Sequence, residues 1–289
     1  MRSGAIRGTR SRRVVNAGIS SRALDYSVMK VAALFATFFI GASAWAQSDA
    51  DAIIKCSVEA NNVDWQAAPQ YDHLERDRQP DGSTKTYEVM MILGSEYQRL
   101  VAVNGKPLST EEQALQQQLL DEVIAQRKRE SPAQRAQRIA KYEKDRKRDH
   151  MLMEQLTVAF NFNVLGERKL GPYEVYELQA TPRPGYQPPN TETKVLTGMR
   201  GKLWIDKLTC QWVKVEAEVV HPVAIVGFLA QVQPGTRFEL EKMPVEDAIW
   251  LPKHFSMKAR ARVLFLFSHN SEDDETYFDY HKASANEWK

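Results

Sequence analysis

Residues 201–220, GKLWIDKLTCQWVKVEAEVV, carry the pattern that decides the fold. Leu203 and Ile205 alternate with Lys202, Trp204 and Asp206. After a turn, a second apolar series occupies every other position: Val213, Val215, Ala217 and Val219. Apolar residues at a period of two are typical of an antiparallel strand with one buried face. The stretch therefore predicts a β-hairpin.

The same alternation recurs along most of the chain. Besides the hairpin, strands are expected at 71–79, 84–93, 97–103, 158–164, 173–180, 236–240, 255–267 and 276–281. Turns are expected at 80–83, 104–105, 167–172 and 272–275, where Pro, Gly, Asn or charged residues gather. Roughly nine to eleven strands and three helices predict an α+β fold, mostly antiparallel β, with one large sheet covered by helices.

The expected helices lie at 48–62 and within 109–153. Ser109 and Glu112 form a capping box, and Leu115, Leu119 and Val123 recur at a helical interval. Ser131-Pro132 can restart a helix, because proline is tolerated in the first turn. We therefore expect two consecutive helices that meet at about residue 131.

Basic residues dominate the second of these helices. Residues 127–148 contain ten Lys or Arg against three Asp or Glu, a local charge of +7. One interpretation is a surface for phosphate, anionic lipid or an acidic partner. The interpretation we favour is a solvated helix with i,i+4 ion pairs such as Lys141 with Asp145, because apolar positions are sparse there.

The N-terminal segment has the pattern of a secretory signal. Lys30 precedes the apolar run 31–40, VAALFATFFI, and Ala44 and Ala46 form an A-x-A site, so cleavage is expected after Ala46. Residues 1–46 are then a removed leader, with translation starting at Met1 or Met29. Residues 47–289 are expected to form a single exported domain with a helical insertion at 109–153. That product has 32 basic and 36 acidic residues, a net charge of −4, which argues against a nucleic-acid binder.

Two cysteines remain after the predicted cleavage, Cys56 and Cys210. An oxidising compartment permits a disulfide between them, but spacing along the sequence does not establish the required approach of the two Cα atoms. Two separate buried thiols are the alternative.

The chain shows no recognisable catalytic or metal-binding motif. H-E-x-x-H, C-x-x-C, G-x-S-x-G and phosphate-binding glycine loops are all missing from the sequence. The acidic run 272–275 does not alternate ligands with spacers as a calcium loop does, so we expect a solvated turn there. A non-enzymatic protein without a cofactor or metal is expected.

A large sheet with one apolar face can form a groove for a ligand. An acyl chain gains about 0.8 kcal/mol per buried CH₂, so such a groove needs few polar contacts. Arg99 is expected on the apolar face of its strand. There its charged end would contact a ligand headgroup or extend into water. The apolar segment 223–232 is either a lid or part of the core. The candidate ligand-binding residues are Met91, Leu93, Arg99, Val101, Val103, Phe160, Phe162, Phe228, Leu229 and Phe265.

Two blocks of the sequence resemble a known family. They are FNFNVLGERKLGPYEVYELQATPRPG at 160–185 and RGKLWIDKLTCQWVKVEAEV at 200–219. With the signal peptide, they resemble periplasmic lipoprotein-carrier proteins of the LolA/LolB-like superfamily, which also contains the envelope-stress sensor RseB. The resemblance implies an incomplete β-barrel with an apolar interior, covering helices and bound acyl chains, with an arginine such as Arg99 in the groove.

These features predict a periplasmic carrier of lipid or lipoprotein acyl chains. The alternative is an envelope interaction or stress-sensing module on the same fold, which would bind a protein partner through the basic helices. A hydrolase that assembles its site from scattered residues is the third class. The sequence does not identify the cargo, the receptor or the oligomeric state.

Overall fold

The structure is a computed structural model, and it describes residues 43–226, 230–246, 248–263 and 267–283 of the 289-residue chain. These residues belong to one compact unit. Ser43 begins the first helix, so the predicted cleavage after Ala46 would fall in that helix's first turn. The cleavage itself stays a prediction.

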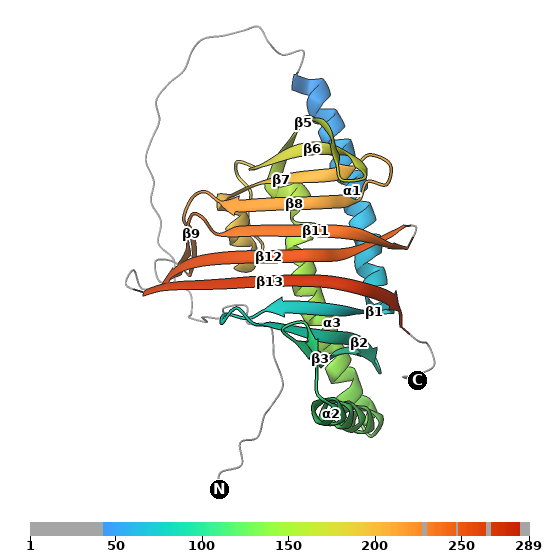
Figure 1. The fold of residues 1–289 in the computed structure, drawn as a ribbon. Coiled ribbons are helices and arrows are strands. Elements are labelled where there is room, and N and C mark those ends of the chain that lie inside the picture. Colours follow the sequence, from blue (N-terminus) through green and yellow to red (C-terminus); the bar gives the residue numbers. More distant parts are fainter. Residues whose placement is uncertain (1–42, 227–229, 247, 264–266, 284–289) are drawn as a thin grey trace, which may run out of the picture. The chain divides into compact units, whose positions relative to one another are not determined.

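One antiparallel sheet of thirteen strands forms the body of this unit (Figure 1). The strands are β1 Tyr71–Arg78, β2 Thr84–Ile92, β3 Ser95–Val103, β4 Lys106–Pro107, β5 Phe160–Leu170, β6 Tyr173–Pro182, β7 Met199–Asp206, β8 Trp212–Val219, β9 Val223–Val226, β10 Ala230–Val232, β11 Arg237–Glu246, β12 Ile249–Val263 and β13 Phe267–Lys282. Their main order is β4-β3-β2-β1-β13-β12-β11-β8-β7-β6-β5, with β10 pairing β12 and β9. No ladder joins β4 to β5 among the described residues, so this sheet is open.

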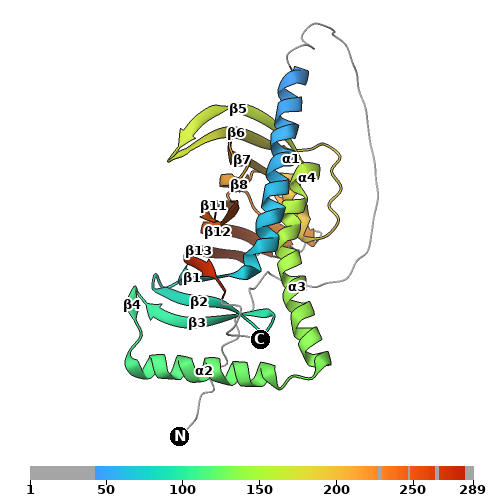
Figure 2. The same cartoon turned by 90° about the vertical axis from the view of Figure 1, so that its right-hand side faces the viewer.

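Most of the helices lie along one side of the sheet, and one helix crosses below strands β2 and β3 (Figure 2). They are α1 Ser43–Ala67, α2 Thr110–Lys128, α3 Pro132–Glu154 and α4 Leu156–Ala159, with 3₁₀ helices η1 Ala68–Gln70 and η2 Glu192–Gly198. α1 packs on β5 and β12, α2 packs on β3, and α3 contacts β3, α1 and η2. This arrangement confirms the predicted α+β class. Within the described parts of the chain, every helix is too short or too polar to cross a membrane.

The main core lies between α1 and strands β5–β8. Its fully or nearly fully buried members are Ala50, Ile54, Ala159, Phe160, Phe162, Leu178, Ala180, Leu196, Leu203, Ile205, Trp212 and Val215. Eight of them come from the four neighbouring strands β5–β8 and four from helices, so the period of two in the strands builds the sheet side of this core. We call the side of the sheet that carries this core the α1 face.

The hairpin at 201–220 is confirmed, with one correction to its apolar face. A bulge between Trp204 and Ile205 pairs Ile205 with Trp212, so Trp212 joins the main core. Val213 points to the opposite face and packs with Trp204. A bulge adds one unpaired residue, so the side chains beyond it point to the face opposite the one that strict alternation predicts.

Several other element boundaries differ from the prediction. Val158 lies in α4 and is half exposed, so β5 begins only at Phe160. β5 continues to Leu170 through the expected turn at 167–172. The expected turn at 272–275 is wrong, because these residues lie inside β13 and pair with β12. Phe267 begins β13 and does not extend β12.

The two helices of 109–153 are confirmed, and so is the predicted capping box at the start of the first. Ser109 with Glu112 and Ser131 with Gln134 each form a capping box. The predicted buried face of the first helix is wrong, because Leu115 and Leu119 are 52% and 40% exposed. The buried contacts come from Leu120 and Ile124, which pack on Met90 and Ile92 of β2.

A disulfide between Cys56 and Cys210 fastens α1 to the loop between β7 and β8. The Cα atoms of the two cysteines are 5.8 Å apart, and 154 residues separate them in sequence. The possibility left open by the sequence is thus decided in favour of the bridge.

We expect loss of this bridge to lower the free energy of unfolding by about 2–5 kcal/mol, because a link across so long a loop strongly restricts the unfolded chain. Urea denaturation of the oxidised protein with and without reductant measures the change. In a Cys56→Ala/Cys210→Ala variant the reductant should have no effect; an equal loss of stability there would contradict the explanation.

Candidate functional site: the α1 face of the sheet

A single row of paired residues shows how the α1 face changes along the sheet. It runs across seven strands through Leu203, Val215, Leu240, Phe255, Glu275, Asp77 and Lys85, each paired with the next. The first four members are apolar and the last three are charged. The boundary lies between β12 and β13, so an apolar area on this face meets a polar one there.

The apolar side of this boundary is only half-buried. Phe238 and Leu240 of β11 lie beside Phe255 and Met257 of β12, and all four are intermediate in exposure. The rings of Phe238 and Phe255 meet edge to face, with centroids 5.4 Å apart. The neighbouring members Val215 and Leu203 are 7% and 3% exposed. The core beneath α1 therefore continues into a more accessible apolar strip.

Alternation along β12 assigns the strip to this face. The predicted apolar positions Phe255, Met257, Ala259 and Ala261 are half-buried, while Lys258, Arg260 and Arg262 between them are exposed. This part of the sequence interpretation is confirmed by the burial pattern. The opposite face of β12 is consequently charged.

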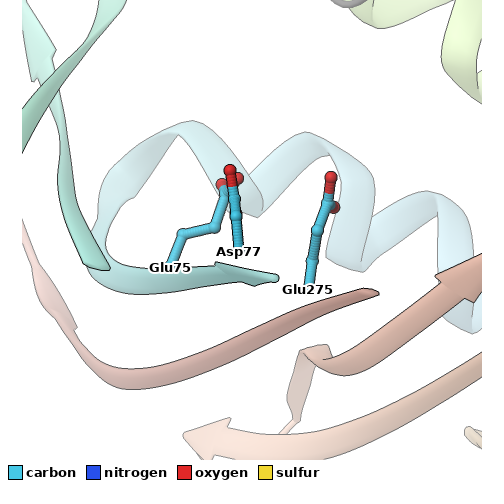
Figure 3. Close-up of side chains that lie close together, drawn as sticks. All are labelled: Glu75, Asp77 and Glu275. Atoms are coloured by element: carbon cyan, nitrogen blue, oxygen red, sulfur yellow. The ribbon is translucent and has the colours of Figure 1, made fainter. Parts of the chain in front are cut away.

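Three carboxylates gather on the polar side of the boundary (Figure 3). Glu75 and Asp77 of β1 and Glu275 of β13 point to the same side, with oxygens within 4.8 Å of one another. Glu75 is 5% exposed. Such oxygens suit calcium or magnesium, but these ions take six or more ligands, of which three carboxylates supply a part. The sequence pattern does not reveal this cluster, because only the pairing of β1 with β13 brings Glu275 to Asp77.

Polar contacts between α1 and the sheet are buried near this area. Lys242 of β11 forms an ion pair with Asp64 of α1 and donates a 2.8 Å hydrogen bond to the Asn61 side chain. Asp64 also accepts hydrogen bonds from the Trp250 backbone N–H and the Gln211 side chain. Burial lowers the pKa of Lys242, and Asp64 opposes that shift by stabilising the ammonium. α1 is therefore fixed in one position across the sheet.

Several arginines of the basic helices form hydrogen bonds that hold these helices to the sheet. Arg127 donates to the carbonyl oxygens of Ile92 and Ser95, and burial lowers its pKa to about 10. Arg138 donates to the Leu93 carbonyl and pairs with Glu130. These contacts hold α2 and α3 to the β2–β3 hairpin, so part of the +7 charge serves the fold.

The remaining basic side chains agree with the solvated-helix interpretation. Lys141 and Asp145 form the predicted i,i+4 ion pair at 2.7 Å, and Asp145 also pairs with Arg148. The pKa of Asp145 is lowered, chiefly by the hydrogen bond from Lys141. The exposed basic residues of the two helices and of the turn between them are Lys128, Arg129, Arg135, Lys141, Lys144 and Lys147.

The structure does not bring the predicted ligand-binding residues together. Phe160 and Phe162 are sealed in the main core, 3% and 2% exposed. Leu93 packs with the β2–α2 cluster around Ile92. Met91, Val101 and Val103 are half-buried on β2 and β3. Phe228, Leu229 and Phe265 lie outside the described residues.

Arg99 has protein partners on the α2 side of β3. Its guanidinium donates to Glu88 at 2.9 Å and to the side chain of Gln117 at 2.9 Å. A quarter of the Arg99 side chain is exposed. The predicted problem of an arginine on an apolar face is thus answered by an ion pair with its cross-strand neighbour.

Comparison with known proteins finds likeness in structure alone. No family model and no curated protein matches the chain. Similar solved structures include an outer membrane lipoprotein-sorting protein domain from Vibrio parahaemolyticus, with 11% identity and a TM-score of 0.31 over 81% of this chain and 95% of that one. A LolA superfamily protein from Nitrosomonas europaea has 12% identity and a TM-score of 0.31 over 81% and 93%. The MucA/MucB complex of Pseudomonas aeruginosa has 11% identity and a TM-score of 0.23 over 82% and 100%.

The LolA superfamily expected from the sequence is therefore represented among the similar solved structures. At these TM-scores the likeness says nothing about a ligand or a mechanism.

We expect Lys242→Met to destabilise the protein by about 3–5 kcal/mol, because it leaves the Asp64 carboxylate buried without its cation. Chemical denaturation at neutral pH measures the loss. A double variant, Asp64→Asn/Lys242→Met, keeps an acceptor for the Trp250 N–H and removes the charge. It should recover most of the stability; no recovery would show that the ion pair is not the cause.

We expect Arg138→Ala to lower the free energy of unfolding by about 1–3 kcal/mol, because the Leu93 carbonyl and the half-buried Glu130 lose their donor. The matched control is Arg135→Ala, an exposed arginine on the same helix, which should stay within about 0.5 kcal/mol of the unaltered protein. Equal losses in the two variants would contradict the fastening role.

Proposed function

We propose that this chain is an exported, non-enzymatic binding protein that carries a ligand with an apolar chain. The ligand lies on the α1 face, along the half-buried strip formed by Phe238, Leu240, Phe255 and Met257. The observation that carries the proposal is the continuity of this strip with the sealed core on one side and with charged residues on the other. An acyl chain of ten carbons on such a strip would gain roughly 8 kcal/mol before the costs of ordering.

Two further features support export. The disulfide between Cys56 and Cys210 suits an oxidising compartment. Residues 29–46 have the order of charge, apolar run and small residues that a secretory signal requires. Together with the resemblance to lipoprotein carriers, they support a periplasmic location and a lipid or lipoprotein cargo.

A protein-binding role through α2 is the second candidate. Leu115 and Leu119 are exposed one turn apart on α2, and exposed lysines and arginines follow on α3. A partner segment with apolar and acidic residues would match this surface. The two roles can coexist, because the surface of α2 and the strip on β11–β12 share no residue.

The test begins with the full chain expressed in a bacterial host and purified from the periplasm. We expect mass spectrometry of the native protein to find a co-purified amphiphile, and N-terminal sequencing to begin after Ala46. The delipidated protein should bind N-phenyl-1-naphthylamine, a neutral apolar probe.

Neighbouring residues of β12 provide matched variants for this test. Met257→Glu puts a carboxylate on the strip and should weaken probe binding at least about tenfold, because desolvating that charge costs more than 1.4 kcal/mol. Lys258→Glu puts the same group on the opposite, exposed face and should leave binding unchanged. The proposal fails if no amphiphile and no probe binds, or if the two variants behave alike.

A further inference from the structure

The seam between α1 and α3 is built around one tryptophan. Trp65 of α1 stacks on the imidazole of His150 of α3, with centroids 4.5 Å apart and planes 14° from parallel. The guanidinium of Arg146, one turn earlier on α3, lies 4.7 Å from the centroid of the Trp65 indole. Arg146 also donates to the Trp65 carbonyl oxygen at 2.5 Å. Two side chains of α3 therefore contact the same residue of α1.

His150 adds a polar contact across the same seam. Its Nε2 lies 3.0 Å from Oδ1 of Asn62, one turn before Trp65 on α1. An amide oxygen only accepts, so Nε2 carries a proton and donates. His150 is 8% exposed. Because this hydrogen bond exists in both protonation states, the environment decides which state the closed seam prefers.

The charged groups around His150 come from two elements. Arg146 on α3 and Lys242 on β11 disfavour a third positive charge, while Glu154 on α3 favours it. Burial disfavours the charged imidazole most strongly, and the pKa of His150 is lowered from its ordinary value. The partners from α1, Asn62 and Trp65, carry no charge. The closed seam therefore prefers neutral histidine.

We propose that His150 is a pH-sensitive clasp between α1 and α3, closed while its imidazole is neutral and loosened when it is protonated. Because the pKa is lower in the closed state, the clasp is fully stable above the ordinary histidine value of about 6.5. Its stability is lost as the pH falls through that value and towards the lowered one. This inference does not depend on the proposed ligand.

The other fastenings of these helices keep the response local. Arg127 of α2 and Arg138 of α3 hold these helices to the β2–β3 hairpin, and neither contact involves a histidine. α1 is held by the disulfide and by the Lys242–Asp64 ion pair. Protonation should therefore free the α3 segment around 146–154 without unfolding the sheet.

The experiment is hydrogen exchange of the full purified protein, followed by mass spectrometry at about pH 7.5 and about pH 5, with correction for the intrinsic exchange rates. We expect faster exchange in peptides covering 146–154 at the lower pH, and unchanged exchange in β7 and β8. The limiting increase is about tenfold for each unit by which the closed-state pKa lies below the open-state value.

Histidine variants make the result decisive. His150→Gln keeps a donor to Asn62 and cannot titrate, so its 146–154 exchange should not respond to pH. His254→Gln removes a different half-buried histidine, which pairs with Asp274 on β13, and should keep the full response. A pH response that survives in His150→Gln, or a protein without any response in 146–154, overturns the proposal.

Discussion

The buried ion pair of Lys242 with Asp64 is the constraint on which the rest of the fold depends. A lysine and an aspartate that are both over nine-tenths buried cost several kcal/mol to desolvate, so they persist only when their remaining hydrogen bonds are made. Asn61, Gln211 and the Trp250 N–H complete that set. Because these partners belong to α1, β11, β12 and the β7–β8 loop, the helix can occupy only one position and direction on the sheet. The disulfide at Cys56 secures the same helix two turns earlier.

Arginine side chains hold the charged helices in place. With ten basic residues at 127–148, α3 could have extended into solvent away from the sheet. Instead Arg127 of α2 donates to a carbonyl oxygen of β2, and Arg138 and Arg146 of α3 donate to carbonyl oxygens of the β2–β3 turn and of α1. Guanidinium groups can satisfy several carbonyl acceptors at once, so they fasten helices to hairpin ends and helix ends where apolar contacts are few.

The sequence predicted the elements whose pattern is local, and failed where pairing over long distances decides. The capping box at Ser109, the helix restart at Ser131-Pro132 and the turn at Asn104-Gly105 depend on neighbouring residues, and all were correct. The covered face of α2 was wrong, because Leu119 and Leu120 offer two helical stripes and only β2 selects between them. The parity of Val213 depends on a bulge, and the cluster of Glu75, Asp77 and Glu275 depends on strand register.

For the candidate site, the sequence identified which residues of β12 lie on the apolar face. It did not identify which other strands contribute to the same apolar strip. Phe160 and Phe162 have the same alternation as Phe255 and Met257, yet the former pair is sealed in the core with α1 and the latter pair is half-buried. Alternation reports which face a side chain occupies and contains no information about what covers that face. α1, held in place through Asp64 and Cys56, seals the part of this face on β5–β8, and the part on β11 and β12 is half-buried. The proposed ligand site would therefore depend on the polar and covalent contacts that hold the helix as well as on the apolar residues that would touch the ligand.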